Sequence, residues 1–217
     1  MKNVVVSALC LTFVLIVVWG VGKKKSYTDI THEEYYYDNV YVAELPEMLC
    51  KTECEKMFDE LEKCSIILRV RPINEPEHLF KVDRQLVNIV ASYKGELTSE
   101  ETVYLYTPKW NVITFGDIKS LELSFVNILS EEHDYLVFCD NIMDQTQTDI
   151  PIVEICSRYL IVPAFCYDEI VNVVSDTIGD STYVKYNDVR ENEFFATSET
   201  GIDEMVSLKH HMIEKYK

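Results

Sequence analysis

The clearest feature of the hydropathy pattern is an uninterrupted apolar run over residues 4–22, VVVSALCLTFVLIVVWGVG, which contains no charged side chain. An apolar stretch of about 18 residues or more is long enough to cross the hydrocarbon core of a bilayer as an α-helix. Trp19 lies near the end of the run, where an indole ring suits the membrane interface. The pattern predicts a transmembrane helix from Val4 to Val21, within an anchor segment of residues 1–25.

Processing and orientation of this segment are separate questions. A cleaved signal peptide has a shorter apolar core, about 7–15 residues, and a small-residue cleavage site. This core is longer and is followed by lysines 23–25, which favours a retained, single-pass signal anchor. Those lysines favour a cytoplasmic domain by the positive-inside rule. The very short N-terminal tail is instead typical of a secretory signal, whose start stays inside the cell.

Helical periodicity appears at both ends of the remaining chain. Residues 26–45 are polar and rich in tyrosine, which predicts a stalk, and residues 46–217 form the expected single domain. In residues 46–63, apolar side chains recur at spacings of three and four after Pro46, which suits a first helical turn. A second helix is expected from about residue 201 to 216, with Ser198 or Thr200 as its N-cap.

Between the helices the apolar period is two, which is typical of β-strands. Strands are expected at residues 65–71, 78–93, 102–106, 134–139, 151–163 and 183–186, and residues 111–115 are a further candidate. In the second of these, the apolar residues change from even to odd positions, which predicts a β-bulge or bend. Five or six short strands with a helix before and after them favour an α+β fold with a small closed barrel of the OB-like type, because closure removes exposed strand edges.

Charge excludes one class of partner. Residues 1–25 contain four lysines and no acidic residue, so the rest of the chain carries 16 basic and 37 acidic residues. A domain with this excess of negative charge is repelled by phosphate backbones, and we expect no nucleic-acid binding. Basic proteins and cations are attracted to it, although such acidity also simply keeps a domain soluble.

Seven cysteines occur, and six of them lie outside the apolar run. An even number permits disulfides in an extracytoplasmic domain, but most of these positions are ones where apolar residues are expected, and a buried free cysteine behaves as a small hydrophobic residue. We expect buried thiols and leave the disulfide alternative open. The six candidates are Cys50, Cys54, Cys64, Cys139, Cys156 and Cys166.

Candidate chemistry is sparse. No serine, glycine-rich loop or histidine pair has a catalytic or phosphate-binding setting, and we expect no catalytic residue, no cofactor and no metal. Cys50 and Cys54 lie one helical turn apart, but a zinc site needs two further ligands. Tyr104, Tyr106 and Trp110 are candidates for a ligand-binding face, since OB-like barrels bind ligands on such aromatic surfaces.

Four segments carry a resemblance to a known group: FDELEKCSIILRVRP (58–72), VNIVASYKG (87–95), ETVYLYTP (101–108) and HDYLVFCDN (133–141). They resemble a broad group of membrane-anchored or secreted proteins of Gram-positive bacteria. The resemblance covers roughly residues 55–145 and implies an OB-like or netrin-like barrel displayed outside the cell. The six cysteines depart from the cysteine-poor habit of that group.

The function expected from these patterns is that of a membrane-anchored, non-catalytic binding or accessory module at the cell membrane, with its domain outside the cytoplasm. It would have a protein or small-molecule partner. Two alternatives stay open. One is a thiol-dependent or hydrolytic enzyme that uses Cys139, Cys156 or Cys166, and the other is an adaptor that faces the cytoplasm.

Overall fold

The computed structural model describes residues 12–13, 16–17, 40–79, 82–115, 118–143, 149–175 and 182–217. Within these residues no helix has both the length and the apolar character needed to cross a bilayer. Most of the apolar run at residues 4–21 lies outside the described residues, and so does the expected stalk up to residue 39. The segment Asp38–Lys217 forms one compact unit, and the description below concerns it alone.

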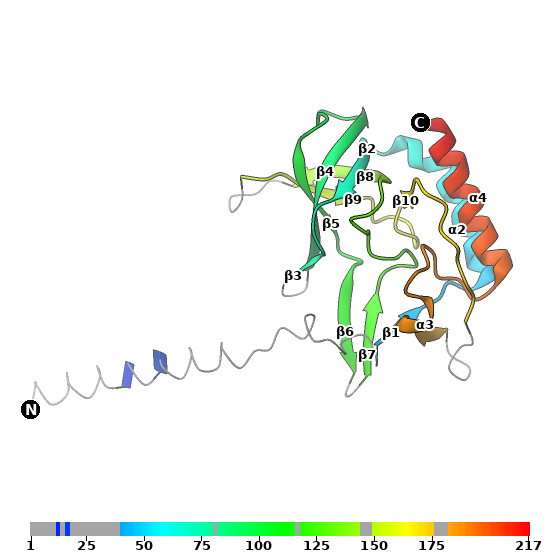
Figure 1. Cartoon of the computed structure of the whole chain (residues 1–217), viewed down its shortest axis with the longest axis horizontal. Coiled ribbons are helices and arrows are strands. Elements are labelled where there is room, and N and C mark those ends of the chain that lie inside the picture. Colours follow the sequence, from blue (N-terminus) through cyan, green and yellow to red (C-terminus); the bar gives the residue numbers. More distant parts are fainter. Residues whose placement is uncertain are drawn as a thin grey trace, which may run out of the picture. The chain divides into compact units, whose positions relative to one another are not determined.

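Five strands close into a small barrel (Figure 1), which is consistent with the expected OB-like fold. They are β2 (Ile66–Pro72), β4 (Val82–Lys94), β5 (Thr102–Thr107), β9 (Ile152–Ile155) and β8 (Tyr135–Met143), in that order around the barrel. Neighbours run antiparallel except β5 and β9, which are parallel, and β8 closes the circuit by pairing with both β9 and β2. Because the barrel is closed, each of the five strands pairs with a neighbour on both of its edges over at least part of its length.

The barrel interior is filled by alternate side chains of each strand. In β5, Val103 and Leu105 are fully buried, and opposite them in β4 lie Val87 and Gln85. Gln85 is a buried amide whose Nε2 donates hydrogen bonds to two backbone carbonyls, at 2.8 and 2.9 Å. The period of two seen in the sequence therefore reflects the inside and outside of a barrel wall.

The sequence predicts one long strand at residues 78–93, and the structure corrects this prediction to two strands. Strand β3 (Glu77–Leu79) forms a hairpin with the start of β4, with Leu79 opposite Val82. The apolar parity changes after this hairpin, between Val82 and Val87, and no bulge lies there, because β4 pairs with β5 in regular register from Asp83 to Asn88. The irregularities in β4 lie further on, where its pairing with β2 skips Val90 and Tyr93.

A second, four-stranded sheet was not expected from the sequence. Its order is β11 (Tyr183–Lys185), β1 (Val40–Ala43), β7 (Ile118–Glu122) and β6 (Asn111–Phe115). Residues 40–45, assigned to the stalk, are therefore part of the domain, since Val40, Val42 and Leu45 are buried in it. Strand β1 has only four residues, and it follows a tyrosine-rich polar sequence, so its apolar pattern was not recognised.

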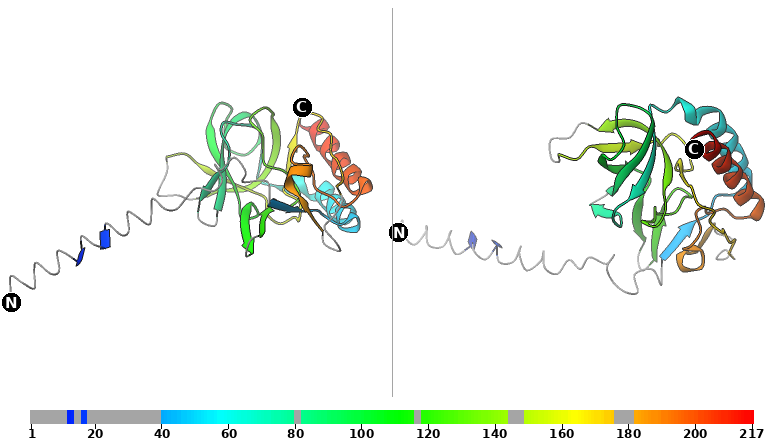
Figure 2. Two further views of the ribbon diagram at one scale, coloured as in Figure 1. Left: turned by 60° about the horizontal axis from the view of Figure 1, so that its bottom comes forward. Right: turned by 45° about the horizontal axis from the view of Figure 1, so that its top comes forward.

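Two helices flank the barrel, as expected, and they lie side by side (Figure 2). Helix α2 (Glu47–Glu60) follows Pro46 and ends in the 3₁₀ turn η3 (Leu61–Lys63), and helix α4 (Glu199–Lys215) ends the chain. Ser198 caps α4, because its Oγ accepts a hydrogen bond from the Gly201 backbone N–H at 3.1 Å. The same hydroxyl donates to Glu47 at 2.8 Å and joins the two helix starts.

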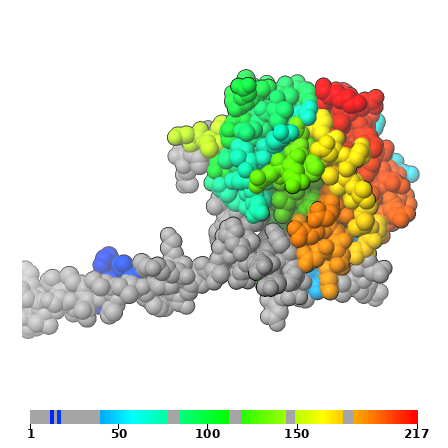
Figure 3. All heavy atoms as spheres, viewed as in Figure 1, coloured from blue at the N-terminus to red at the C-terminus, as the bar shows by residue number. Residues whose placement is uncertain are grey.

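The helices approach closely where α4 begins. A Cβ added to Gly201 would lie 3.1 Å from the Cys50 sulfur and 3.1 Å from the Ala196 Cβ, so a larger residue would push these neighbours away by a few tenths of an ångström. The four-residue helix α3 (Tyr186–Val189) follows β11, and strand β10 (Ala164–Cys166) pairs with β8. Figure 3 shows the barrel strands and the C-terminal helix on different sides of the domain.

A buried ion pair holds α4 in place. Lys209 Nζ lies 2.6 Å from Glu193 Oε2 and donates to the Asp168 carbonyl at 2.7 Å, and both charged side chains are almost fully buried. The other carboxylate oxygen of Glu193 accepts from the Cys166 backbone N–H at 2.6 Å. Because every polar atom of the pair has a partner, the burial of two charges is tolerated here.

Replacing Lys209 by methionine should destabilise the fold strongly. Glu193 would keep its buried carboxylate without a counter-charge, and loss of one partner of such a pair costs about 3–5 kcal/mol. Urea unfolding at pH 7, followed by circular dichroism, measures this. The double variant Lys209→Met/Glu193→Gln, which keeps an acceptor for the Cys166 N–H, should recover more than half of the loss. A single variant as stable as the parent would contradict this reading.

Glu44 is the opposite case, a buried carboxyl without a partner. It is 1% exposed, and neither carboxylate oxygen has a hydrogen-bond partner among the described residues. Burial raises its pKa from 4.5 to about 7. Between these two values the unfolded chain loses the proton while the folded chain keeps it, so the stability contributed here falls as pH rises and is lowest above pH 7.

The variant Glu44→Gln removes this titration. It should be more stable than the parent above pH 7 by roughly 2 kcal/mol, and the difference should vanish below about pH 4.5. Parallel urea unfolding of both proteins across this range measures it. Glu75→Gln, at an exposed residue, is the matched control and should show no such pH-dependent difference. A constant difference at all pH values would mean that Glu44 does not titrate between the two pKa values.

Candidate ligand-binding surfaces and thiol clusters

The first candidate surface is the outer face of strands β4 and β5. Tyr104 and Tyr106 both point away from the barrel interior, opposite Leu86 and Arg84 of β4. The hairpin strand β3 extends this face, because Glu77 pairs with Arg84. In OB-like barrels the equivalent strands form the ligand face, so the expected location for the two tyrosines agrees with the strand order.

Most of the polar and aromatic groups on this face already have interaction partners within the protein. The Arg84 guanidinium lies 3.9 Å from the centre of the Tyr104 ring and is paired with Glu77 at 2.9 Å. The Tyr104 hydroxyl donates to the same carboxylate at 3.2 Å, and the residue is only 9% exposed. Because a guanidinium already covers its ring, Tyr104 offers little surface on which a base or sugar can stack.

Trp110 does not belong to this face. The residue is 2% exposed, and its indole N–H has no hydrogen-bond partner among the described residues. The structure therefore separates the three aromatic candidates: Tyr106 is half-buried on the outer face, Tyr104 is covered by Arg84, and Trp110 is part of the core. Residue type and strand parity indicated an aromatic surface, but they did not show which rings neighbouring side chains would cover.

All six domain cysteines are buried, free thiols. Burial raises the pKa of the Cys50 thiol to about 11 and that of Cys54 to about 12. The Cys139 thiol, inside the barrel wall, is shifted in the same direction. A thiol that stays protonated and out of solvent is a poor nucleophile, so these three residues do not support the alternative of a thiol-dependent enzyme.

Cys166 is the thiol with the most catalytic surroundings. Its sulfur, the His133 ring and the Asp168 carboxylate lie within 4.8 Å of one another, and His133 Nδ1 is 2.8 Å from Asp168 Oδ2. The thiol is nevertheless fully buried, and burial raises its pKa to about 11. A catalytic cysteine needs a lowered pKa and access to substrate, and Cys166 has neither.

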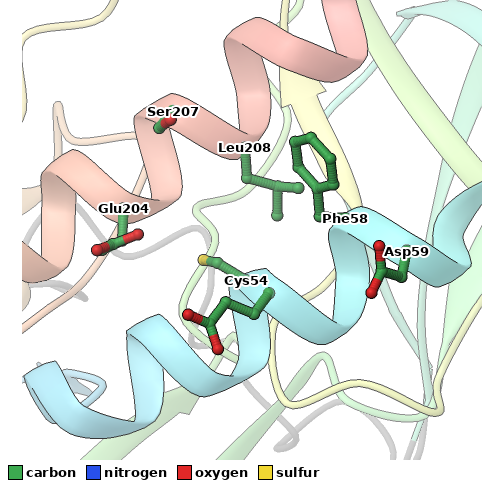
Figure 4. Close-up of a pocket in the computed structure, with 7 residues that line it drawn as sticks. Cys54, Phe58, Asp59, Glu204, Ser207 and Leu208 are labelled. Carbon is green, nitrogen blue, oxygen red and sulfur yellow. The ribbon is translucent and has the colours of Figure 1, made fainter.

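A groove between α2 and α4 was not identified from the sequence. It has a volume of about 400 Å³ and is open to solvent. Figure 4 shows Phe58 of α2 and Leu208 of α4 pointing toward one another, with the Cys54 thiol below them between the helices. The remaining lining side chains are polar, and they are Glu55, Asp59, Glu204 and Ser207.

The charged side chains that line the groove are all negative. Three of its seven lining residues are acidic and none is basic. No described lysine or arginine forms an ion pair with Glu55, Asp59 or Glu204. Their carboxylates therefore face solvent around an apolar strip, where Phe58, 45% exposed, stacks on the His211 ring at a centroid distance of 3.9 Å. Such a surface is suited to a ligand with an apolar body and positive charges.

The sequence does contain a signal for half of this groove. Glu55 and Asp59 are four residues apart, so they share one face of α2, and Phe58 lies beside them. Their counterparts Glu204 and Leu208 have the same spacing in α4. What the sequence lacks is the pairing of two helices about 150 positions apart, which comes from tertiary packing alone.

Comparison with known proteins finds no family model and no curated protein that matches this chain.

Proposed function

We propose that this chain is a membrane-anchored, non-catalytic binding module, and that its α2–α4 groove binds a basic segment of a partner protein. The observation that carries the proposal is the groove itself: three carboxylates that form no ion pair with a described residue surround the exposed ring of Phe58, and no basic residue lines the groove. A concave surface with a few convergent polar groups is the usual form of a binding site. The partner is a polypeptide rich in lysine or arginine.

Lysine and arginine fit both parts of this surface. Their aliphatic stems pack on an exposed apolar side chain such as Phe58, while their charged ends reach neighbouring carboxylates. The negative charge of the whole domain, 37 acidic against 16 basic residues after the anchor segment, adds long-range attraction and speeds the encounter with a basic partner. The same charge opposes nucleic-acid ligands.

Anchoring and location rest on the sequence. The apolar run over residues 4–21 has the length of a bilayer-spanning helix, and the barrel has the form expected from the resemblance to anchored or secreted Gram-positive proteins. These support a single-pass membrane protein with its domain outside the cytoplasm. Lysines 23–25 favour the reverse orientation, a cytoplasm-facing adaptor, and that is the second candidate.

Binding through the groove should depend on charge and position. The probe is a short fluorescent peptide of lysine and leucine, titrated into the full chain in detergent and followed by anisotropy. The variant Glu55→Gln/Asp59→Asn/Glu204→Gln should bind it about tenfold more weakly, because each exposed charge contact contributes a fraction of a kcal/mol. Added salt should weaken binding to the parent by screening.

The matched control carries the same change in net charge elsewhere. Glu75→Gln/Glu96→Gln/Glu131→Gln alters three exposed residues outside the groove, and it should bind the peptide nearly as well as the parent. A peptide in which glutamate replaces lysine should not bind. Equal weakening in both triple variants would mean that only net charge attracts the probe, which would overturn the groove as the site.

Orientation is measurable because the six native cysteines of the domain are buried. A cysteine placed at Glu96, an exposed residue in the turn between β4 and β5, should be the reactive thiol of the domain. We expect a membrane-impermeant maleimide to label the Glu96→Cys variant in intact cells, and the parent to remain nearly unlabelled. Labelling of the variant only after lysis would place the domain in the cytoplasm and replace the surface module by the adaptor.

A further inference from the structure

Three potential metal ligands meet beside strands β8 and β9, and none of them lines the α2–α4 groove. The sulfurs of Cys64 and Cys156 and a carboxylate oxygen of Asp140 all lie within 4.8 Å of one another. Cys64 follows the 3₁₀ turn η3, Asp140 is in β8, and Cys156 follows β9. Both cysteines are almost fully buried, at 0% and 1% exposure.

A local irregularity of β8 brings the carboxylate to the thiols. The pairing of β8 with β9 passes from Cys139 opposite Ile155 to Asn141 opposite Glu154, so Asp140 is an extra residue in a β-bulge. Bulges of this kind redirect a side chain relative to regular strand geometry. In the same place the Cys156 backbone N–H donates to the Phe138 carbonyl at 2.9 Å, which fixes the start of the segment that carries Cys156.

The charges around this cluster are balanced for a divalent cation. Arg158 donates a hydrogen bond to Asp140 and forms an ion pair with it. Two thiolates and one carboxylate carry three negative charges, which a divalent cation and the Arg158 guanidinium together neutralise. Without metal, two protonated thiols beside the Asp140–Arg158 pair are also neutral. Neither state leaves net charge in the protein interior, and metal binding releases the two thiol protons.

A buried polar group without a partner provides an independent observation. The Tyr159 side chain is 1% exposed, and its hydroxyl has no hydrogen-bond partner among the described residues. The Arg158 guanidinium, which pairs with Asp140, lies 5.8 Å from the centre of the Tyr159 ring, so this ring is a neighbour of the cluster. A phenol here is suited to hydrogen-bond a water molecule in the open position of a metal with three protein ligands.

We propose that Cys64, Asp140 and Cys156 form a binding site for a thiophilic divalent cation, with Zn²⁺ as the metal that fits best. Zinc accepts sulfur and carboxylate ligands in tetrahedral geometry, in which ligand sulfurs lie roughly 3.8 Å apart. The groups observed need to approach by about 1 Å at most. Calcium and magnesium require mainly oxygen ligands and do not suit two sulfurs. Arg158 then orients the ligating carboxylate.

The second cluster, His133, Cys166 and Asp168, is less suitable. His133 and Asp168 are already bonded to each other at 2.8 Å. The Lys209 ammonium group, 2.7 Å from the Asp168 carbonyl, brings a positive charge beside the ligands. That charge is neutralised by Glu193. The Asp168 side chain is also 61% exposed, whereas both thiols of the Cys64 cluster are buried.

Cobalt is the probe for the experiment, because thiolate ligation gives Co²⁺ a strong sulfur-to-metal absorption band. The full chain in detergent, treated with chelator and kept reduced, is titrated with Co²⁺ and then with Zn²⁺. We expect one cobalt per chain with the thiolate band, and loss of the band when Zn²⁺ displaces it. Cys64→Ser and Cys156→Ser should each abolish the band, and Cys54→Ala should retain it.

Asp140→Asn provides a second readout if a cysteine variant does not fold, since Asp140 is half-buried. It should fold and bind cobalt at least about tenfold more weakly, with a changed band. Zn²⁺ should raise the thermal unfolding temperature of the parent more than that of this variant. Absence of the thiolate band in the reduced, folded parent would overturn the proposal, and so would a Cys64–Cys156 disulfide recovered from native membranes.

Discussion

Strand β8 is the constraint on which the rest of the domain depends, because the barrel closes only if this strand pairs along both edges. One edge pairs with β2 over Tyr135–Cys139, and the other pairs first with β10 and then with β9. The first five residues of β8 are consequently all buried. A strand covered on both faces must be apolar throughout, which explains why its sequence does not alternate. The partner along the second edge changes from β10 to β9 between Val137 and Cys139, and the bulge at Asp140 follows within the pairing with β9.

The helices depend on the barrel through buried polar contacts as well as apolar packing. Phe138 of β8 packs against Phe165 and against Tyr216 at the end of α4. The Tyr167 hydroxyl donates to the Tyr216 carbonyl at 2.7 Å, and Lys209 binds Glu193. Apolar packing alone would permit small rotations of α4 about its axis. The charged hydrogen bond between Lys209 and Glu193 has a fixed direction and restricts these rotations. The contacts of α4 with the barrel therefore determine the width of the groove between α4 and α2.

The sequence was informative where one residue pattern determines one environment. Both flanking helices follow from apolar spacings and end signals, with Ser198 as the cap, and most barrel strands follow from period-two alternation. Strands β1, β7 and β10 were missed because each has only three to five residues, too few to show a clear period of two. The hairpin of β3 and β4 was read as one strand because β3 has only three residues. Contacts decide such cases, and a single sequence does not contain them.

The lack of contact information in a single sequence also limits what it shows about the candidate sites. Tyr104 and Tyr106 were visible as aromatic residues on a strand, but their value as a surface depends on Arg84, whose position over the Tyr104 ring comes from pairing with Glu77. The cysteines were visible as a set of six, yet spacing favoured Cys50 and Cys54, which are adjacent on one helix. Cys64 and Cys156, which are brought together, are 92 positions apart. Long-range closure of the barrel is what joins them.

Helix α2 connects the two proposed sites physically. Its outer face carries Glu55 and Asp59 of the groove, while on its inner side the Glu53 carboxylate accepts from the Leu160 backbone N–H at 2.7 Å. Lys56 donates to the Arg158 carbonyl at 3.4 Å. Residues 156–160 include the ligand Cys156 and Arg158. These two hydrogen bonds hold that segment against α2, which ends just before Cys64. A cation bound at the thiols would fix this segment and the end of α2 together, whereas a ligand in the groove contacts only the opposite face. Metal binding should therefore stabilise the helix pair without being required for the groove to bind.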